Sequence, residues 1–126
     1  MLNRHENPLL AGLAEDRMAA MIITDGHHLP DDLIKIIIRV KGVDNVIVTS
    51  DACSICCCAP GEYDLWGNHA VLTADGKFYN PEKECLVAAA STMDMCMKHL
   101  EKMNFLSGDD LLKLGRINAL KLLGIK

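Results

Sequence analysis

Two apolar runs, each closed by an aspartate, set the hydrophobic pattern of the first half of the chain. Residues 18–24 are followed directly by Asp25, and a second run over residues 43–49 is followed closely by Asp51. Runs of this length, bounded by turn residues, are typical of strands that are buried on both faces. We therefore predict two strands and expect residues 18–24 to pair with residues 45–50.

The segment between the two runs has the pattern of an amphipathic helix. Pro30 suits the first turn, where Asp31 and Asp32 favour the positive end of the helix dipole. Gly42 is a common terminator, so that we predict a helix over residues 31–41. Its apolar stripe comprises Leu33, Ile34, Ile37, Ile38 and Val40, and the side chains expected to face water are Lys35, Arg39 and Lys41. A strand, a helix and a strand with short connections predict a parallel pair joined by a right-handed crossover.

The rest of the chain divides into an N-terminal segment, a β-rich middle part and two C-terminal helices. Residues 1–12 are interpreted as a loop, with a short helical turn over 14–17. A hairpin is predicted from residues 62–65 and 70–73, and a third strand from 78–79 onward.

The two closing helices are predicted from their N-terminal sequences. Residues 91–94 resemble a capping box that begins at Ser91, and the helix is expected to run to about Met103. The last helix is expected to open at Ser107 and to end at Gly124. Its expected apolar positions are Leu111, Leu112, Leu114, Ile117, Leu120 and Leu123.

Composition and charge exclude several classes of partner. The net charge is −4 and the lysines and arginines form no cluster, which argues against nucleic acid. No apolar run reaches the roughly 18–20 residues of a membrane span, and no signal peptide is visible. We therefore expect a cytoplasmic protein that binds neither nucleic acid nor a membrane, with its six cysteines as thiols.

The two strand-ending aspartates are expected at one rim. Ligands bind at the carboxyl ends of the strands in parallel α/β folds, which predicts that Asp25 and Asp51 point to one ligand-binding edge. The alternative is that either aspartate only shapes a loop. Two parallel strands do not form a stable sheet alone, because their apolar faces need further strands. The sequence therefore predicts a missing sheet partner, either another chain or an N-terminal half.

Six short segments, in the expected order and spacing, resemble N-acetylglucosamine-6-phosphate deacetylases of the amidohydrolase superfamily. They are residues 4–8 (RHENP), 23–30 (ITDGHHLP), 41–42 (KG) followed by 46–52 (VIVTSDA), 60–63 (PGEY), 72–77 (LTADGK) and 91–94 (STMD). The resemblance covers nearly all 126 residues. It implies a metal-dependent (β/α)8 barrel with a small β-sandwich.

The fold class expected from this resemblance is α/β. The chain would be a partial (β/α)8 barrel made of the last two β/α units, with a small β-hairpin insertion and C-terminal helices. Residues 1–126 would form a single domain, the C-terminal fragment of an amidohydrolase-type barrel.

The resemblance also implies roles for individual residues. Asp51 matches the catalytic aspartate at the end of strand eight, which takes a proton from metal-bound water and passes it to the leaving nitrogen. It is a metal ligand only together with the missing N-terminal half. His28 matches a histidine that contacts the sugar, and Arg4 matches an arginine that binds the sugar phosphate. The substrate loop of the family falls at Leu86 and Ala88. The alternative for His28 is an ordinary exposed loop histidine.

Two departures from the family pattern bear on activity. The substrate loop of the family reads Leu-Ala-Gly-Ser, and here Ala88 replaces the glycine, which restricts the backbone where φ can be positive. The metal-ligating glutamate and two histidines of the family have no match in this chain. A divalent metal such as zinc is therefore expected for the full enzyme, and none for this chain alone.

The loop after Asp51 departs from the family as well, because small residues are replaced by CSICCC over residues 53–58. Cys53 and Cys56 have the Cys-x-x-Cys spacing of metal and redox sites, although a second such pair is absent. The alternatives are a structural metal site with Cys53 and Cys56 as ligands, a redox pair, and ordinary partly buried thiols.

Two classes of function follow from the sequence. In the first, the chain is part of an enzyme that removes the acetyl group from N-acetylglucosamine 6-phosphate, and it is inactive alone. Its partners would be a phosphorylated N-acetyl amino sugar and either a complementing N-terminal half or further copies in a homo-oligomer. In the second, the chain is a non-catalytic remnant or interaction module, with the cysteine-rich segment as a candidate metal site.

Overall fold

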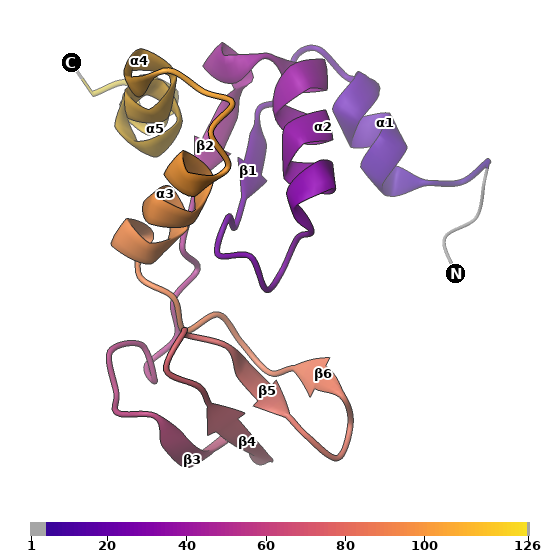
Figure 1. Ribbon diagram of the computed structural model, residues 1–126. Helices are drawn as coiled ribbons and strands as arrows, with labels where there is room; N and C mark the ends of the chain where they lie inside the picture. Colours follow the sequence, from indigo (N-terminus) through magenta and orange to yellow (C-terminus); the bar gives the residue numbers. More distant parts are fainter. Residues whose placement is uncertain (1–4, 126) are drawn as a thin grey trace.

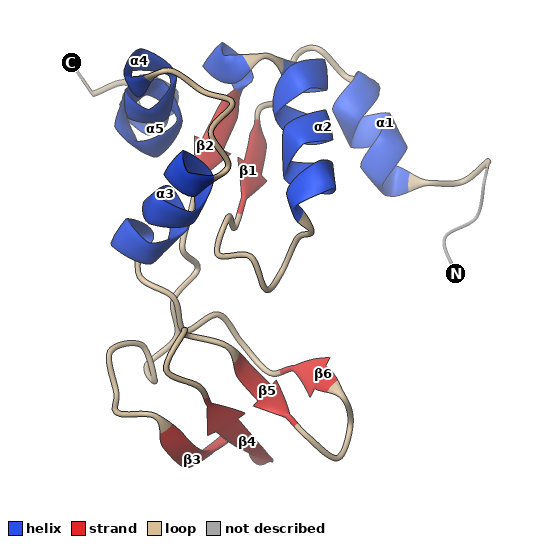
Figure 2. Ribbon diagram, in the orientation of Figure 1, coloured by secondary structure: helices blue, strands red, loops and turns tan. Residues whose placement is uncertain are grey.

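The structure is a computed structural model that describes residues 5–125 (Figure 1). The helices are α1 (Pro8–Ala14), α2 (Asp31–Lys41), α3 (Met93–Lys102), α4 (Gly108–Leu112) and α5 (Asn118–Leu122), with a 3-10 turn at Val43–Asn45 and a π-helical turn at Lys113–Ile117. The strands are β1 (Ala20–Ile22), β2 (Val46–Val48), β3 (Gly61–Leu65), β4 (Asn68–Leu72), β5 (Phe78–Asn80) and β6 (Cys85–Leu86). Figure 2 shows the helices gathered around the two-stranded sheet and the four-stranded sheet set apart from them.

β1 and β2 form the predicted parallel pair. Ala20 lies opposite Val46 and Ile22 lies opposite Val48. α2 connects the two strands and ends at Gly42, whose φ is 75° and whose N–H donates to the carbonyl of Ile38 at 2.9 Å. The strand–helix–strand prediction is confirmed, and the fold is mixed α/β. The second strand starts later than expected, because residues 43–45 form the 3-10 turn.

The prediction that both strands are buried on two faces is wrong for β1. Ile22, Val46 and Val48 pack into one core with α2, α3 and the π-helical turn; the other buried members are Ile34, Ile37, Ile38, Cys96, Leu100 and Leu114. Successive side chains of a strand point to opposite faces. Met21 therefore points away from this core and is 61% exposed.

The polar side of α2 also differs from the prediction. Lys41 is buried, because its Nζ donates to the carbonyls of Glu15 at 2.7 Å and of Gly12 at 3.4 Å. These carbonyls lie at the C-terminal end of α1, where a positive charge is favourable. Val40 was expected in the apolar stripe, and it is exposed.

The prediction of a loop over residues 1–12 is wrong for the described part, because α1 begins at Pro8. The side-chain oxygen of Asn7 accepts from the N–H groups of Leu9 at 3.1 Å and Leu10 at 3.3 Å. Asparagine at the N-cap followed by proline is a strong helix start. The segment expected as a helical turn is instead a turn closed by the Met18 N–H and the Glu15 carbonyl at 3.2 Å.

The middle of the chain forms an antiparallel sheet in the order β3-β4-β5-β6. The predicted hairpin and third strand are confirmed. Trp66 and Gly67 join β3 to β4 with φ angles of 52° and 74°, the conformation of a two-residue hairpin turn. β6 was not predicted, because its two residues show no alternation. The buried residues of the hydrophobic core at this sheet are Ala70, Leu72, Phe78 and Ala90.

The cap of α3 lies one residue further along than predicted. Thr92 accepts from the N–H of Met95 at 3.2 Å, whereas Ser91 is buried and its Oγ has no hydrogen-bond partner among residues 5–125. The predicted start of the last helix at Ser107 is confirmed, and Ser107 forms a capping box there with Asp110. No helix within residues 5–125 is long and apolar enough to cross a membrane.

Candidate functional site

The loop after β1 is built around the side chain of Asp25, which is 1% exposed. Its Oδ1 accepts from the backbone N–H groups of His27 at 2.9 Å and His28 at 3.1 Å, and its Oδ2 lies 2.9 Å from Nδ1 of His28. The short aspartate side chain thus folds the following residues back on themselves. It holds the His28 ring, whose side chain is 23% exposed, in one orientation.

The charge of Asp25 follows from these contacts. Burial raises the pKa of this carboxyl, but the hydrogen bonds from the His27 and His28 N–H groups and from the His28 ring outweigh burial and lower the pKa below its ordinary value. Asp25 is therefore a carboxylate near neutral pH. A neutral His28 donates from Nδ1 to this carboxylate, which leaves Nε2 as an acceptor for a ligand.

The same loop is fixed against α3. Thr24 donates its hydroxyl to the carbonyl of Cys96 at 3.0 Å. Gly26 has a φ of 80°, and a Cβ at this position would lie 2.6 Å from Cε1 of His99. The His99 ring in turn lies 2.8 Å from Oδ1 of Asp31. A side chain larger than hydrogen at position 26 would therefore displace the ring that links α3 to the start of α2.

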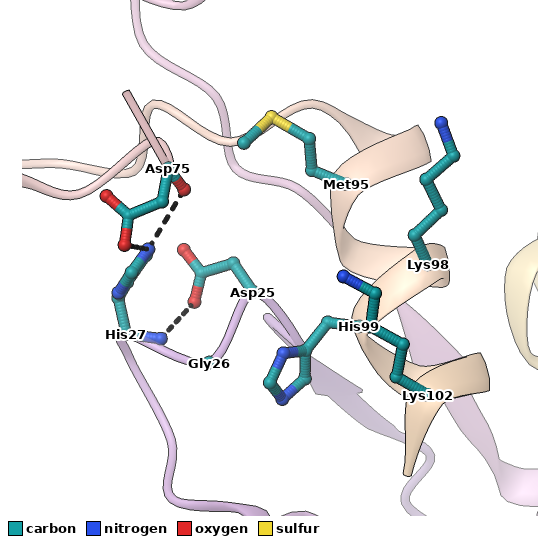
Figure 3. A pocket seen from close by; sticks show the side chains of 8 residues that line it. All are labelled: Asp25, Gly26, His27, Asp75, Met95, Lys98, His99 and Lys102. Atoms are coloured by element: carbon teal, nitrogen blue, oxygen red, sulfur yellow. Dashed lines mark hydrogen bonds and ion pairs between the residues drawn. The ribbon is translucent and has the colours of Figure 1, made fainter. Parts of the chain in front are cut away.

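A cavity of about 440 Å³ lies between this loop and α3 (Figure 3). His27 reaches across its edge, where Nε2 lies 3.1 Å from the carbonyl of Asp75 and 3.8 Å from its carboxylate. Lys98, His99 and Lys102 line the α3 side. Asp25, predicted at the ligand-binding edge, lines this cavity, whereas none of the described residues to which the resemblance assigns a site role does so.

A second cavity of about 450 Å³ lies on the other side of His27. Leu86, a predicted substrate contact, lines it together with Lys77 and Tyr79. The Lys77 Nζ sits 4.5 Å from the centre of the Tyr79 ring. Sequence reasoning missed the position of His27 between the two cavities. The adjacent histidines after the first strand are the signal that pointed to this loop.

Asp51 lies at the carboxyl end of β2 in a constrained backbone. It is exposed and has a φ of 49°, which is unusual for a residue other than glycine. Ala52 forms a parallel bridge with Ala89, and the Cys53 N–H donates to the Ala89 carbonyl at 2.8 Å. The fold thus brings the segment of Asp51 next to the segment of Ala88, two predicted site positions far apart in sequence.

The other predicted site positions, His28 and Arg4, are not part of the bridge that joins the segments of Asp51 and Ala88. His28 follows the other strand of the parallel pair and is held by Asp25. Arg4 lies outside the described residues, so its predicted phosphate contact stays a prediction.

The side chains present do not complete a metal site. Within residues 5–125 no three histidine, cysteine, aspartate or glutamate side chains are grouped so that they could hold a metal ion. A catalytic zinc takes about three protein ligands. Asp51 alone, or Cys53 with Cys56, falls short of that number, and the described residues do not fit a divalent metal without further ligands.

Fold and site define a mixed α/β protein whose candidate site lies where a parallel strand pair ends. No protein-family model matches the chain. The chain is 27% identical over 117 residues to the N-acetylglucosamine-6-phosphate deacetylase of Lysinibacillus sphaericus. The matched region covers 91% of this chain and 30% of that protein.

Solved structures give the same relationship. The N-acetylglucosamine-6-phosphate deacetylase of Thermotoga maritima superposes with a TM-score of 0.83 at 22% identity, over 98% of this chain and 34% of that one. The enzyme of the same name from Pasteurella multocida superposes with a TM-score of 0.77 at 26% identity, over 90% of this chain and 29% of that one. The predicted resemblance to the C-terminal part of these deacetylases is confirmed. The chain spans about a third of the length of the relatives it matches.

Proposed function

We propose that this chain supplies the C-terminal part of the catalytic barrel of a metal-dependent deacetylase. The substrate of the assembled enzyme would be N-acetylglucosamine 6-phosphate, whose acetyl amide is hydrolysed in the cytoplasm. The observation that carries the proposal is the likeness to such deacetylases over nearly the whole chain, although it covers only about a third of their length. The chain alone would be inactive, because it offers one matching carboxylate where the metal needs several ligands.

The exposed apolar surface along β1 supports the proposal that a further part of the barrel packs against this edge. Among the described residues, β1 pairs with β2 alone. A groove of about 210 Å³ runs between α1 and β1, and Leu9, Leu13, Met18 and Met21 line it. An unpaired strand edge beside an apolar groove is a ready site for another strand. We propose that a strand from an N-terminal half pairs with β1 here.

The residues of this chain would take separate roles in the assembled site. The divalent metal, held mainly by the N-terminal half, would supply an activated water and polarise the acetyl carbonyl. Asp51, at the exposed end of β2, would accept the proton of that water and return it to the sugar nitrogen. His28 would present Nε2 to a sugar hydroxyl, because Asp25 holds the other ring nitrogen. Leu86 and Ala88 would contact the sugar, and Arg4 its phosphate.

A complementation experiment tests the proposal. The chain is mixed with the part of the Lysinibacillus sphaericus deacetylase that precedes the matched region, in the presence of a divalent metal. Acetate released from N-acetylglucosamine 6-phosphate is then measured. We expect no turnover from either piece alone and metal-dependent turnover from the mixture.

Asp51→Asn should abolish that turnover while the two pieces still co-elute. Asp16→Asn, an exposed aspartate outside the candidate site, is the matched control and should leave turnover unchanged. Turnover by the isolated chain, or an active mixture that contains Asp51→Asn, would contradict the assigned role.

A non-catalytic interaction module is the second candidate function. The observation that favours it is Ala88, which replaces the glycine of the substrate loop beside Asp51. The same experiment separates the two functions, because a module would co-elute with the N-terminal piece without restoring turnover. Ala88→Gly should then raise turnover if only the loop conformation prevents catalysis.

A further inference from the structure

The cysteine-rich loop after β2 is anchored at its base and open at its tip. The Cys53 N–H donates to the Ala89 carbonyl at 2.8 Å, and Cys53 and Ile55 pack against the core of the antiparallel sheet. Two successive turns follow, closed by the Cys56 N–H with the Cys53 carbonyl at 3.0 Å and by the Cys58 N–H with the Ile55 carbonyl at 3.1 Å. The backbone under the thiols is therefore well defined.

Two thiols lie close together on this base. The Sγ atoms of Cys56 and Cys57 are 3.7 Å apart, with Cys56 half-buried and Cys57 exposed. Cys57 has a φ of 68°, a conformation that few residues other than glycine adopt. A disulfide requires an S–S distance of about 2.05 Å and Cα atoms at least about 4.4 Å apart, whereas adjacent Cα atoms are about 3.8 Å apart. The pair is therefore suited to remain two thiols rather than to close on itself.

We propose that Cys56 and Cys57 form a two-thiol binding site for a soft monovalent cation, Cu(I). This site is independent of the proposed deacetylase function. Thiolates are soft ligands that select Cu(I), and Cu(I) accepts two sulfur ligands in a nearly linear arrangement. Structural zinc takes four ligands, and no three suitable side chains are grouped within residues 5–125. The exposed Cys57 can adjust its rotamer to widen the pair around the ion.

Protons compete with a cation for this pair of thiols. Burial raises the pKa of Cys56, and the neighbouring thiol of Cys57 together with Cys53 and Cys58 raises it further. Two adjacent thiolates repel each other, and a cation between them removes that repulsion. Both thiols lose their protons on binding, so the affinity for Cu(I) should rise with pH.

Competition for Cu(I) tests the site. The full chain is titrated anaerobically, in the presence of a reductant, against the coloured complex of Cu(I) with bicinchoninate at pH 6 and pH 8. We expect the chain to withdraw one Cu(I) and to do so more strongly at pH 8. Cys56→Ser and Cys57→Ser should each weaken binding at least about tenfold.

Cys85→Ser is the matched control. Cys85 is exposed like Cys57 but lies on β6, so its loss should leave the affinity unchanged. Circular dichroism establishes that each variant is folded. A chain that leaves the copper on bicinchoninate, or one that keeps its affinity in the double variant of Cys56 and Cys57, would overturn the proposal.

Discussion

Asp25 and Asp51 each follow a strand of the parallel pair, yet their surroundings differ. The sequence placed both at strand ends, and the structure agrees. The Asp25 carboxylate is engaged within its own loop, because two backbone N–H groups and the His28 ring converge on it. Asp51 is exposed. Sequence could not separate the two residues, since this convergence depends on the path of the whole loop. The pairing of His27 with Asp75 was likewise hidden, because the two residues are 48 positions apart in the sequence.

The first prediction concerns the carboxylate of Asp25. Its folded-state pKa is lowered, so the stability it contributes is present above the pKa of an unfolded aspartate, about 3.9, and is lost as pH falls through the folded value. Asp25→Asn should lower the free energy of unfolding by about 1–3 kcal/mol at pH 7. Urea unfolding at pH 7 and at pH 3 measures the difference, which should shrink at the lower pH. An equal loss at both pH values would show that the ionised carboxylate is not the cause.

The second prediction concerns Gly26. Gly26→Ala should lower the free energy of unfolding by about 1–3 kcal/mol, because it combines a positive φ with a Cβ that meets the His99 ring. Gly42→Ala is the control, since Gly42 has a φ of 75° and, among the described residues, nothing beyond its own chain neighbours lies within 4 Å of the added Cβ. Thermal unfolding compares the two. If both variants lose the same stability, the contact with His99 carries no cost.

At the scale of elements, the strand–helix–strand unit and the hairpin followed from periodicity and turn residues, whereas the last helix did not. It contains a π-helical turn at Lys113–Ile117. Such a turn inserts an extra residue and rotates the following positions around the helix axis. Ile117 and Leu123, expected in the apolar stripe, are therefore exposed, and Asn118 is buried instead. A regular helical repeat cannot indicate where an extra residue is accommodated.

The third prediction concerns this buried asparagine. The Asn118 side-chain amide donates to the carbonyls of Val43 and Val46, each at 2.7 Å, and so links the last helix to the start of β2. Asn118→Ala should lower the free energy of unfolding by about 1–3 kcal/mol, because two carbonyls lose their donor. Arg116→Ala, on the exposed side of the same turn, should change it by less than about 0.5 kcal/mol. Similar losses for both variants in denaturant titrations would exclude a specific role for the amide.

At the scale of the whole molecule, the sequence indicated that a two-stranded parallel sheet needs a partner. The structure describes such a sheet, with Met18 and Met21 exposed near its β1 edge. The periodicity of the sequence could not identify the chain that covers this edge. An apolar edge predicts only that its neighbour is apolar as well. Similarity to proteins about three times as long supports the proposed N-terminal half.

The fourth prediction concerns self-association of the isolated chain. Two copies can shield their β1 edges from water, so light scattering at tens of micromolar should report a dimer or a higher oligomer. Met21→Lys should shift the population toward monomer, because it places a charge on that edge. Trp66→Lys is the control, since Trp66 is 74% exposed at the tip of the hairpin far along the chain from β1. A wild-type chain that is monomeric under these conditions would contradict the prediction.

The bridge between Ala52 and Ala89 determines where the sequence of this protein can be lengthened, shortened or replaced. Residues 53–88 leave the helical body and return to it at neighbouring backbone positions, which are about 5 Å apart in paired strands. A short peptide could span that gap, so the antiparallel sheet is an insertion that can lengthen, shorten or be exchanged without breaking the parallel pair. A hydrogen bond between the His27 ring and the Asp75 carbonyl joins the insertion to the helical body, and an exchanged segment must be compatible with it. New sequences, including the cysteine-rich loop, can therefore be acquired there at little cost to the rest of the fold.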